Sequence, residues 1–158
     1  MLIRVLEAFH FVALIGGAQS SPMGTNANNN AFRKEIYFFY GSLMDPSTLA
    51  RVLRLQQQPE LLPAKIVGYR CKLWGPYPAL LDGPPDATVH GMAYEVQSQV
   101  EKERLEWYET YHYKNSPCSI DLQDGRKVPG RTFKWNLEPA LLEEGTFDLN
   151  DWQRSNFS

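Results

Sequence analysis

The chain carries a dense apolar run, IYFFY at residues 36–40, that leads directly into GSL at residues 41–43 and then into Asp45-Pro46-Ser47. β-Branched and aromatic residues in such a run are typical of a buried strand, and the glycine that follows permits a tight turn. The aspartate offers a side chain that can cap a helix, and the proline suits the first helical position. This segment therefore predicts a strand, a tight turn and a helix in direct succession.

Apolar patterning and turn signals continue along the rest of the chain. They predict further strands at residues 64–70, 71–74, 77–81, 88–96, 113–122 and 131–135. Ser98 is followed three residues later by Glu101, a capping-box pattern that predicts a helix over residues 99–110. This order mixes hairpin-type links with few crossovers. We therefore expect an α+β fold with a mixed, largely antiparallel, barrel-like β core and flanking helices.

The N-terminal part of the chain differs in composition from the rest. Residues 1–18 combine a basic start with a moderately apolar stretch and resemble a secretory signal peptide, although two polar residues interrupt the stretch. Residues 24–30 are polar and of low complexity, as in disordered segments. We expect residues 1–35 to be a leader, disordered or a possible signal peptide, and residues 36–158 to form the domain. The sequence favours a cytoplasmic location, with secretion as the alternative if the leader holds a signal peptide.

Composition excludes several classes of function. Of the 158 residues, 16 are lysine or arginine and 18 are aspartate or glutamate, a net charge of −2, so a broad nucleic-acid surface is not expected. No apolar run reaches the length of about 18 residues that a membrane-spanning helix needs. Cys71 and Cys118 suit neither a disulfide framework nor a zinc site, and in strands they are expected to be inert. No metal is expected, and the oligomeric state stays open.

Two segments are candidates for chemistry. In Tyr40-Gly41-Ser42-Leu43, backbone N–H groups beside a helix start could hold a carboxylate or a developing oxyanion, and the alternative is an ordinary turn. Glu109 flanks the apolar face of its predicted helix, where aromatic neighbours would raise the pKa of its carboxyl, and the alternative is a solvent-facing glutamate. The apolar face is expected to hold Val100, Leu105, Tyr108 and Tyr111, with residues 101–104 in solvent.

Several short segments occur in a fixed order along the chain. They are Tyr40-Gly41-Ser42-Leu43, Gly68-Tyr69, Tyr77-Pro78-Ala79, Val89-His90-Gly91, Tyr108-Glu109 and Tyr113. This ordered set resembles the γ-glutamylcyclotransferase-like family, also called the AIG2-like family, over about residues 36–136. The resemblance implies a compact, mostly antiparallel barrel-like core and an enzyme that needs no metal or organic cofactor.

The resemblance also implies a reaction. Family members cleave a γ-glutamyl amide when the substrate's own α-amine attacks its γ-carbonyl, which releases an amine and 5-oxoproline. Glu109 corresponds to the catalytic glutamate that moves protons between the two amines. The substrate-binding positions correspond to Tyr40, Gly41, Ser42, Leu43 and Tyr113. The expected partner is a small γ-glutamyl amine, peptide or glutathione-like compound. The alternative is a binding or defence-associated module of the same fold with weak or no catalysis.

Two residues depart from the family pattern. Thr110 stands where the family often has glycine after the catalytic glutamate, and a β-branched residue resists positive φ, so we expect a different local backbone. Lys114 stands where an arginine is common, and lysine keeps the charge but loses bidentate geometry. Both departures point to a changed substrate preference.

Overall fold

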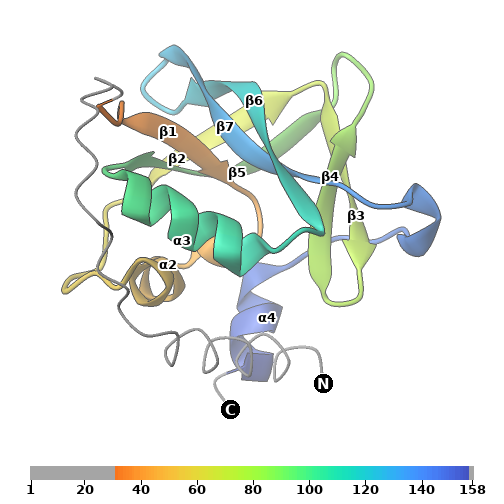
Figure 1. The fold of residues 1–158 in the computed structure, drawn as a ribbon. Coiled ribbons are helices and arrows are strands. Elements are labelled where there is room, and N and C mark those ends of the chain that lie inside the picture. Colours follow the sequence, from red (N-terminus) through yellow and green to blue (C-terminus); the bar gives the residue numbers. More distant parts are fainter. Residues whose placement is uncertain (1–30, 157–158) are drawn as a thin grey trace, which may run out of the picture. The chain divides into compact units, whose positions relative to one another are not determined.

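The computed structural model describes residues 31–156, so the possible signal peptide and the low-complexity segment lie outside the described residues. Residues 32–156 form a closed barrel of strand order β1-β5-β2-β6-β7 and a two-stranded ribbon of β3 and β4 (Figure 1). The strands are β1 (Glu35–Phe39), β2 (Leu62–Val67), β3 (Tyr69–Trp74), β4 (Tyr77–Asp82), β5 (Thr88–Val96), β6 (Tyr113–Leu122) and β7 (Lys127–Trp135). The helices are η1 (Ser42–Met44), α2 (Pro46–Leu53), α3 (Gln99–Glu109), η2 (Pro139–Leu141) and α4 (Leu149–Asn156). This architecture confirms the predicted α+β class with a barrel-like core.

Strand β1 closes the barrel, because it pairs antiparallel with β5 on one side and parallel with β7 on the other. Glycines allow both neighbours to approach it closely. A Cβ added at Gly91 of β5 would lie 2.1 Å from the carbonyl oxygen of Phe39, and one at Gly130 of β7 would lie 2.4 Å from that of Ile36. A side chain at either position would therefore push β1 away from its partner.

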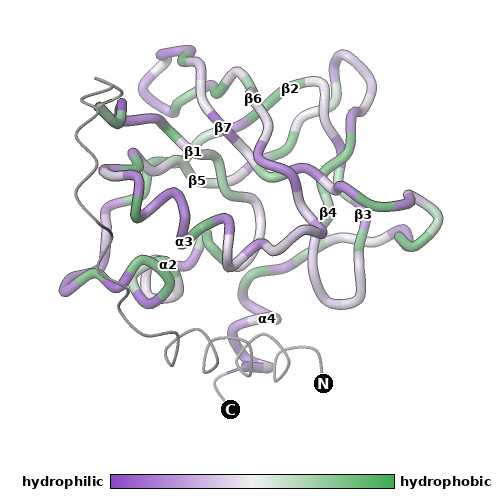
Figure 2. Tube along the Cα trace, in the orientation of Figure 1, coloured by the Kyte–Doolittle hydropathy of each residue, from purple (hydrophilic) through white to green (hydrophobic). Residues whose placement is uncertain are grey.

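Alternate residues of β1 enter two different parts of the core. Tyr37 and Phe39 pack with apolar residues of α2 and α3, whereas Phe38 and Tyr40 join a cluster with residues of β2, β4 and β6. Helices α2 and α3 cover this side of the barrel (Figure 1). Residues on both faces of β1 are buried from Tyr37 onward, and Figure 2 shows the strand partly green and partly pale.

The predicted start of α2 is confirmed. The Asp45 carboxylate accepts hydrogen bonds from the Thr48 N–H (3.1 Å) and the Thr48 hydroxyl (2.6 Å), and Pro46 occupies the first helical position. Gln153 of α4 also donates to Asp45, at 3.1 Å, so the cap fastens the last helix to the turn after β1. None of the helices within residues 31–156 has the length and apolar character that a bilayer crossing requires.

The exposed and buried faces of α3 differ from the prediction. Ser98 caps the helix as expected, accepting from the Glu101 N–H at 3.2 Å, and Leu105 is fully buried. Val100 and Tyr111, however, are 51% and 73% exposed. Glu101 is buried instead of solvated, because its carboxylate accepts hydrogen bonds from the Tyr94 hydroxyl and the Gln97 N–H. The predicted apolar and solvent-facing positions are therefore wrong for these three residues. At Glu101, two specific donors compensate the burial of the carboxylate.

Two strand boundaries also differ. The break between β2 and β3 falls at Gly68, which has φ +89°, and not between residues 70 and 71. Its N–H donates to Ala87 and its carbonyl accepts from Gly83, so the kink is held by main-chain hydrogen bonds. Strand β7 begins at Lys127, earlier than predicted, because its pairing with β6 extends to Asp121 opposite Lys127.

Candidate active site

Glu109 is the last residue of α3, and unlike the buried Glu101 its carboxylate has no hydrogen-bond donor among the described residues. The residue is partly buried, whereas Glu103 and Glu106 are exposed. Burial raises the pKa of the Glu109 carboxyl from 4.5 to about 8. The C-terminal end of a helix also disfavours a negative charge. Within residues 31–156 no hydrogen bond or ion pair to this carboxyl offsets its partial burial.

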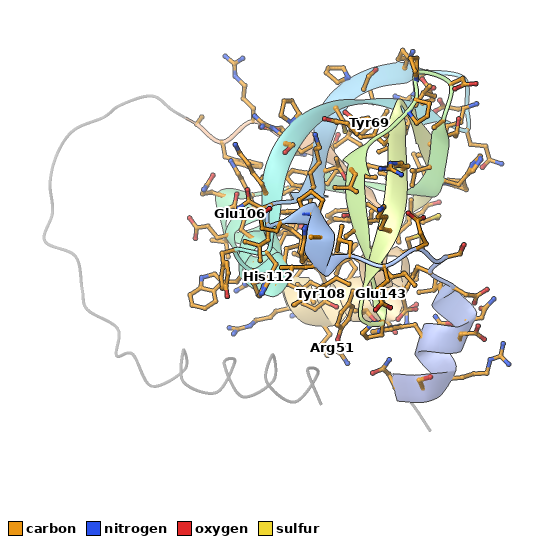
Figure 3. The ribbon with its side chains drawn as sticks, turned by 90° about the vertical axis from the view of Figure 1, so that its right-hand side faces the viewer. Arg51, Tyr69, Glu106, Tyr108, His112 and Glu143 are labelled. Atoms are coloured by element: carbon orange, nitrogen blue, oxygen red, sulfur yellow. The ribbon has the colours of Figure 1, made fainter. Side chains whose placement is uncertain are left out.

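Three tyrosines from different elements surround Glu109. Burial raises the pKa of Tyr40, Tyr108 and Tyr113, and the nearby charge of Glu109 raises each of them further. All three phenols are therefore neutral hydroxyls at physiological pH. The Tyr113 hydroxyl donates to the carbonyl of Pro78 at 2.9 Å, and the Tyr108 hydroxyl forms a 2.6 Å hydrogen bond with the Ser42 hydroxyl. Figure 3 shows Tyr108 and His112 at the same end of the molecule.

The loop after β1 reaches this site through two contacts. Ser42 bonds Tyr108, the neighbour of Glu109 in the chain, and Gly41 packs against Pro78, where an added Cβ would lie 3.0 Å from the ring. The main chain turns here as the short helix η1, with the Met44 N–H donating to the Gly41 carbonyl at 3.0 Å. The first N–H groups of such a turn have no acceptor within it. The loop thus contacts Tyr108, the residue before Glu109 in the chain, and Pro78, which accepts from Tyr113.

The loop residues divide into two groups. Gly41 and Ser42 contact the residues around Glu109, whereas Leu43 is 2% exposed and points into the core below α2. Tyr40 is buried, and its hydroxyl donates to the Phe133 carbonyl and accepts from the Leu80 N–H. The side chains of Tyr40 and Leu43 are therefore structural in this arrangement, and only their main chains remain available as binding groups.

Sequence reasoning missed two members of the site. Tyr108 was assigned to the apolar face, although its hydroxyl holds Ser42, and Pro78 contacts both the loop and Tyr113. The only sequence signal for them was their presence in the ordered segments Tyr108-Glu109 and Tyr77-Pro78-Ala79.

Other chemistries find less support among the residues that the structure describes. Burial raises the pKa of Cys71 to about 12 and that of Cys118 to about 11, so both stay protonated and weakly nucleophilic. No group of three or more His, Cys, Asp or Glu side chains within residues 31–156 is arranged to hold a metal ion. A surface hollow lined by Leu62, Leu122, Gln123 and Asp124 contains none of the candidate residues.

The structural role of Tyr40 can be tested by its replacement with phenylalanine. We expect the free energy of unfolding to fall by about 1–3 kcal/mol, because buried main-chain groups of Phe133 and Leu80 lose their partner. Urea unfolding of the purified chain measures this change. Tyr111→Phe is the matched control, since the Tyr111 side chain is exposed, and we expect an effect within about 0.5 kcal/mol. Equal effects of the two substitutions would contradict the structural role.

Thr110 adopts a positive φ, although a β-branched residue resists it. Thr110 has φ 64° and ψ −176°, a region that is populated almost only by glycine, and it ends α3 in that conformation. Holding a β-branched residue there costs on the order of 1–3 kcal/mol. The chain thus keeps a glycine-like geometry after the glutamate without having the glycine.

Comparisons with known proteins agree with this geometry. The family described as "Gamma-glutamyl cyclotransferase, AIG2-like" matches residues 37–154. The comparison with curated proteins returned no significant match.

Solved structures show the same fold. A protein from Arabidopsis thaliana is 24% identical with a TM-score of 0.61, and the match covers 83% of this chain and 88% of that one. An AIG2-like protein from Mus musculus is 18% identical with a TM-score of 0.56, covering 74% and 90%. A yeast γ-glutamyl cyclotransferase specific to glutathione is 15% identical with a TM-score of 0.52, covering 67% and 69%. Together with the match over residues 37–154, the barrel fold confirms the resemblance, and the chain belongs to the γ-glutamyl cyclotransferase, AIG2-like family.

Proposed function

We propose that this protein is a γ-glutamylcyclotransferase that converts a small γ-glutamyl amine or peptide into 5-oxoproline and a free amine. The observation that carries the proposal is the partly buried Glu109 carboxyl, whose pKa is raised to about 8 by burial, at the end of a helix whose Tyr108 is bound by Ser42 of the loop. A group with a pKa near the working pH can both accept and release a proton efficiently. Family membership supports the same class of reaction.

The raised pKa of Glu109 suits a substrate whose nucleophile is an amine. A neutral carboxyl next to a free amine carries the same protons as a carboxylate next to an ammonium ion. A desolvated site favours the neutral pair, because burial penalises charge. The α-amine of the substrate is therefore held in its nucleophilic form when it lies beside Glu109.

In the proposed reaction the α-amine nitrogen forms a bond to the γ-carbonyl carbon, and the amide C–N bond then breaks. Glu109, as the neutral carboxyl, gives its proton to the departing nitrogen and takes up the proton that the attacking nitrogen loses, so the neutral carboxyl is regenerated. Because the nucleophile is tethered to the electrophile, the protein mainly has to fix a near-attack geometry. Nucleophile and leaving group both belong to the substrate, so the bond changes balance without a cofactor.

The loop and the tyrosines would position the substrate. Backbone N–H groups of Gly41, Ser42 and Leu43 are suited to the glutamyl carboxylate or to the tetrahedral oxyanion. The Ser42 hydroxyl is oriented by Tyr108, while the Tyr113 hydroxyl is already bound to Pro78, so its ring serves as a wall. We place this reaction in the cytoplasm, where the free thiols of Cys71 and Cys118 stay reduced.

The full chain should be assayed against a panel of γ-glutamyl amines, γ-glutamyl dipeptides and glutathione, with both 5-oxoproline and the released amine quantified. We expect equimolar formation of the two products from at least one compound. The matched control is the same compound with an acetylated α-amine, which should not react because its nucleophile is blocked. Turnover of the acetylated compound would contradict intramolecular attack, and a panel without product would favour the non-catalytic binding module.

A further inference from the structure

The backbone conformation of Thr110 is one that threonine disfavours, so it needs stabilising contacts. A threonine at φ 64° and ψ −176° returns to a relaxed conformation unless other contacts hold it. Main-chain bonds contribute on both sides: the Thr110 N–H donates to the Glu106 carbonyl at 3.0 Å, and the Tyr113 N–H donates to the Thr110 carbonyl at 3.4 Å. A glycine could form the same bonds, so the additional support must come from the threonine side chain.

The Thr110 side chain is held by His112. The hydroxyl oxygen of Thr110 lies 2.6 Å from Nδ1 of His112, and the main-chain N–H of His112 points to the same oxygen at 3.4 Å. When the His112 ring is neutral with its proton on Nε2, the Thr110 hydroxyl donates to Nδ1 while its oxygen accepts from the His112 N–H. Burial lowers the pKa of His112, which favours the same neutral form.

His112 is itself fixed by a stack of aromatic rings. Its ring centroid lies 4.3 Å from that of Tyr111 and 4.4 Å from that of Trp74 on β3. The His112 carbonyl accepts from the Asn136 N–H at 2.8 Å, which ties this segment to the end of β7. The imidazole is therefore anchored to two other parts of the fold, and it can hold Thr110 against its relaxed conformation.

We propose that His112 is a positioning residue, which acts through the Thr110 hydroxyl to keep the glycine-like backbone that fixes the direction of Glu109. The inference rests on the proposed role of Glu109 in proton transfer. It also explains how this chain keeps the geometry of the site with a threonine in place of glycine. His112 needs no contact with substrate in this role.

The test is a cycle of substitutions at positions 110 and 112. His112→Phe keeps an aromatic ring in the stack but removes Nδ1, and we expect kcat for the substrate found in the panel to fall about tenfold with KM nearly unchanged. Thr110→Gly accepts the same φ without support, so in that background His112→Phe should change kcat less than about twofold. His112→Asn, which places a polar atom near the position of Nδ1, should restore most of the loss. An equal loss of kcat in both backgrounds would assign His112 a merely structural role and overturn the proposal.

A second readout does not depend on activity. Titration of the Glu109 carboxyl carbon by ¹³C NMR, with Glu109→Gln used to assign the signal, follows the environment of this group directly. We expect His112→Phe to lower the pKa of Glu109 from about 8 toward 4.5, because a reoriented carboxyl becomes hydrated, and Thr110→Gly to suppress this change. An unchanged Glu109 titration in His112→Phe would overturn the inference. A wild-type chain that turns over no γ-glutamyl compound would instead count against the proposed function, and the titration would still decide the role of His112.

Discussion

Replacing Glu109 with glutamine is expected to lower kcat/KM for γ-glutamyl substrates by about 10²–10⁴-fold, the usual contribution of a general acid–base residue. Glutamine has nearly the same shape and fills the same place at the end of α3, but it cannot exchange a proton between the two amines. Release of 5-oxoproline under single-turnover and steady-state conditions measures the loss. Circular dichroism of the variant verifies that the barrel is intact.

The matched control is Glu103→Gln, the same chemical change on the same helix. Glu103 is exposed, and its carboxylate contacts only Gln99 of the same helix, at 3.3 Å. We expect this variant to retain full activity. If Glu109→Gln remained as active as Glu103→Gln, Glu109 would not carry the proton transfer, and the proposed mechanism would be wrong.

The same Glu109→Gln substitution is expected to stabilise the protein at alkaline pH. Burial raises the pKa of Glu109 from 4.5 to about 8 in the folded chain, whereas the unfolded chain retains the ordinary value. Between these two values the folded state binds a proton that the unfolded state does not, so the free energy of unfolding falls as the pH rises. Above about pH 8 the buried carboxylate is charged and its full penalty applies. Glutamine removes this penalty at every pH.

Urea unfolding between pH 4 and pH 9 measures the difference. One pKa unit corresponds to about 1.4 kcal/mol, and the glutamine amide pays a smaller desolvation cost of its own, so we expect a net gain of about 2–4 kcal/mol at pH 9. The gain should vanish toward pH 4, where the carboxyl is protonated in both states. Glu103→Gln is measured alongside as the control at an exposed site. A Glu109→Gln variant that is less stable than wild type at pH 9 would mean that the carboxyl is solvated.

These opposite effects of one substitution define what Glu109 contributes. We expect the residue to lower the stability of the folded chain at alkaline pH, because burial raises the pKa of its carboxyl and no described residue compensates it. The same desolvation gives it the pKa that proton transfer to and from an amine requires. Loss of activity together with a gain in stability would be difficult to obtain from a glutamate with a purely structural role.

Features set by near neighbours in the chain were predictable. The buried strand at residues 36–40, the caps of α2 and α3, and the strands β5 and β6 follow from apolar patterning, turn residues and capping side chains. Each of these signals acts over a few residues, which is why one sequence can reveal it.

Features set by distant segments were not predictable in the same way. The Tyr40 hydroxyl is buried because, in the closed barrel, it donates to the Phe133 carbonyl and accepts from the Leu80 N–H. No spacing along the chain contains this information.

The sequence by itself determined the fold class, the family resemblance and the identity of Glu109 and its loop as candidates, because these depend on local patterns and on the order of short segments. Only the tertiary structure decided that Ser42 meets Tyr108 across 66 residues of chain and that Glu109 is desolvated. It also decided the conformation of Thr110, where propensity predicted a relaxed backbone. The fold places a positive φ there, and the Thr110 hydroxyl lies against His112, whose ring stacks on Trp74 of β3.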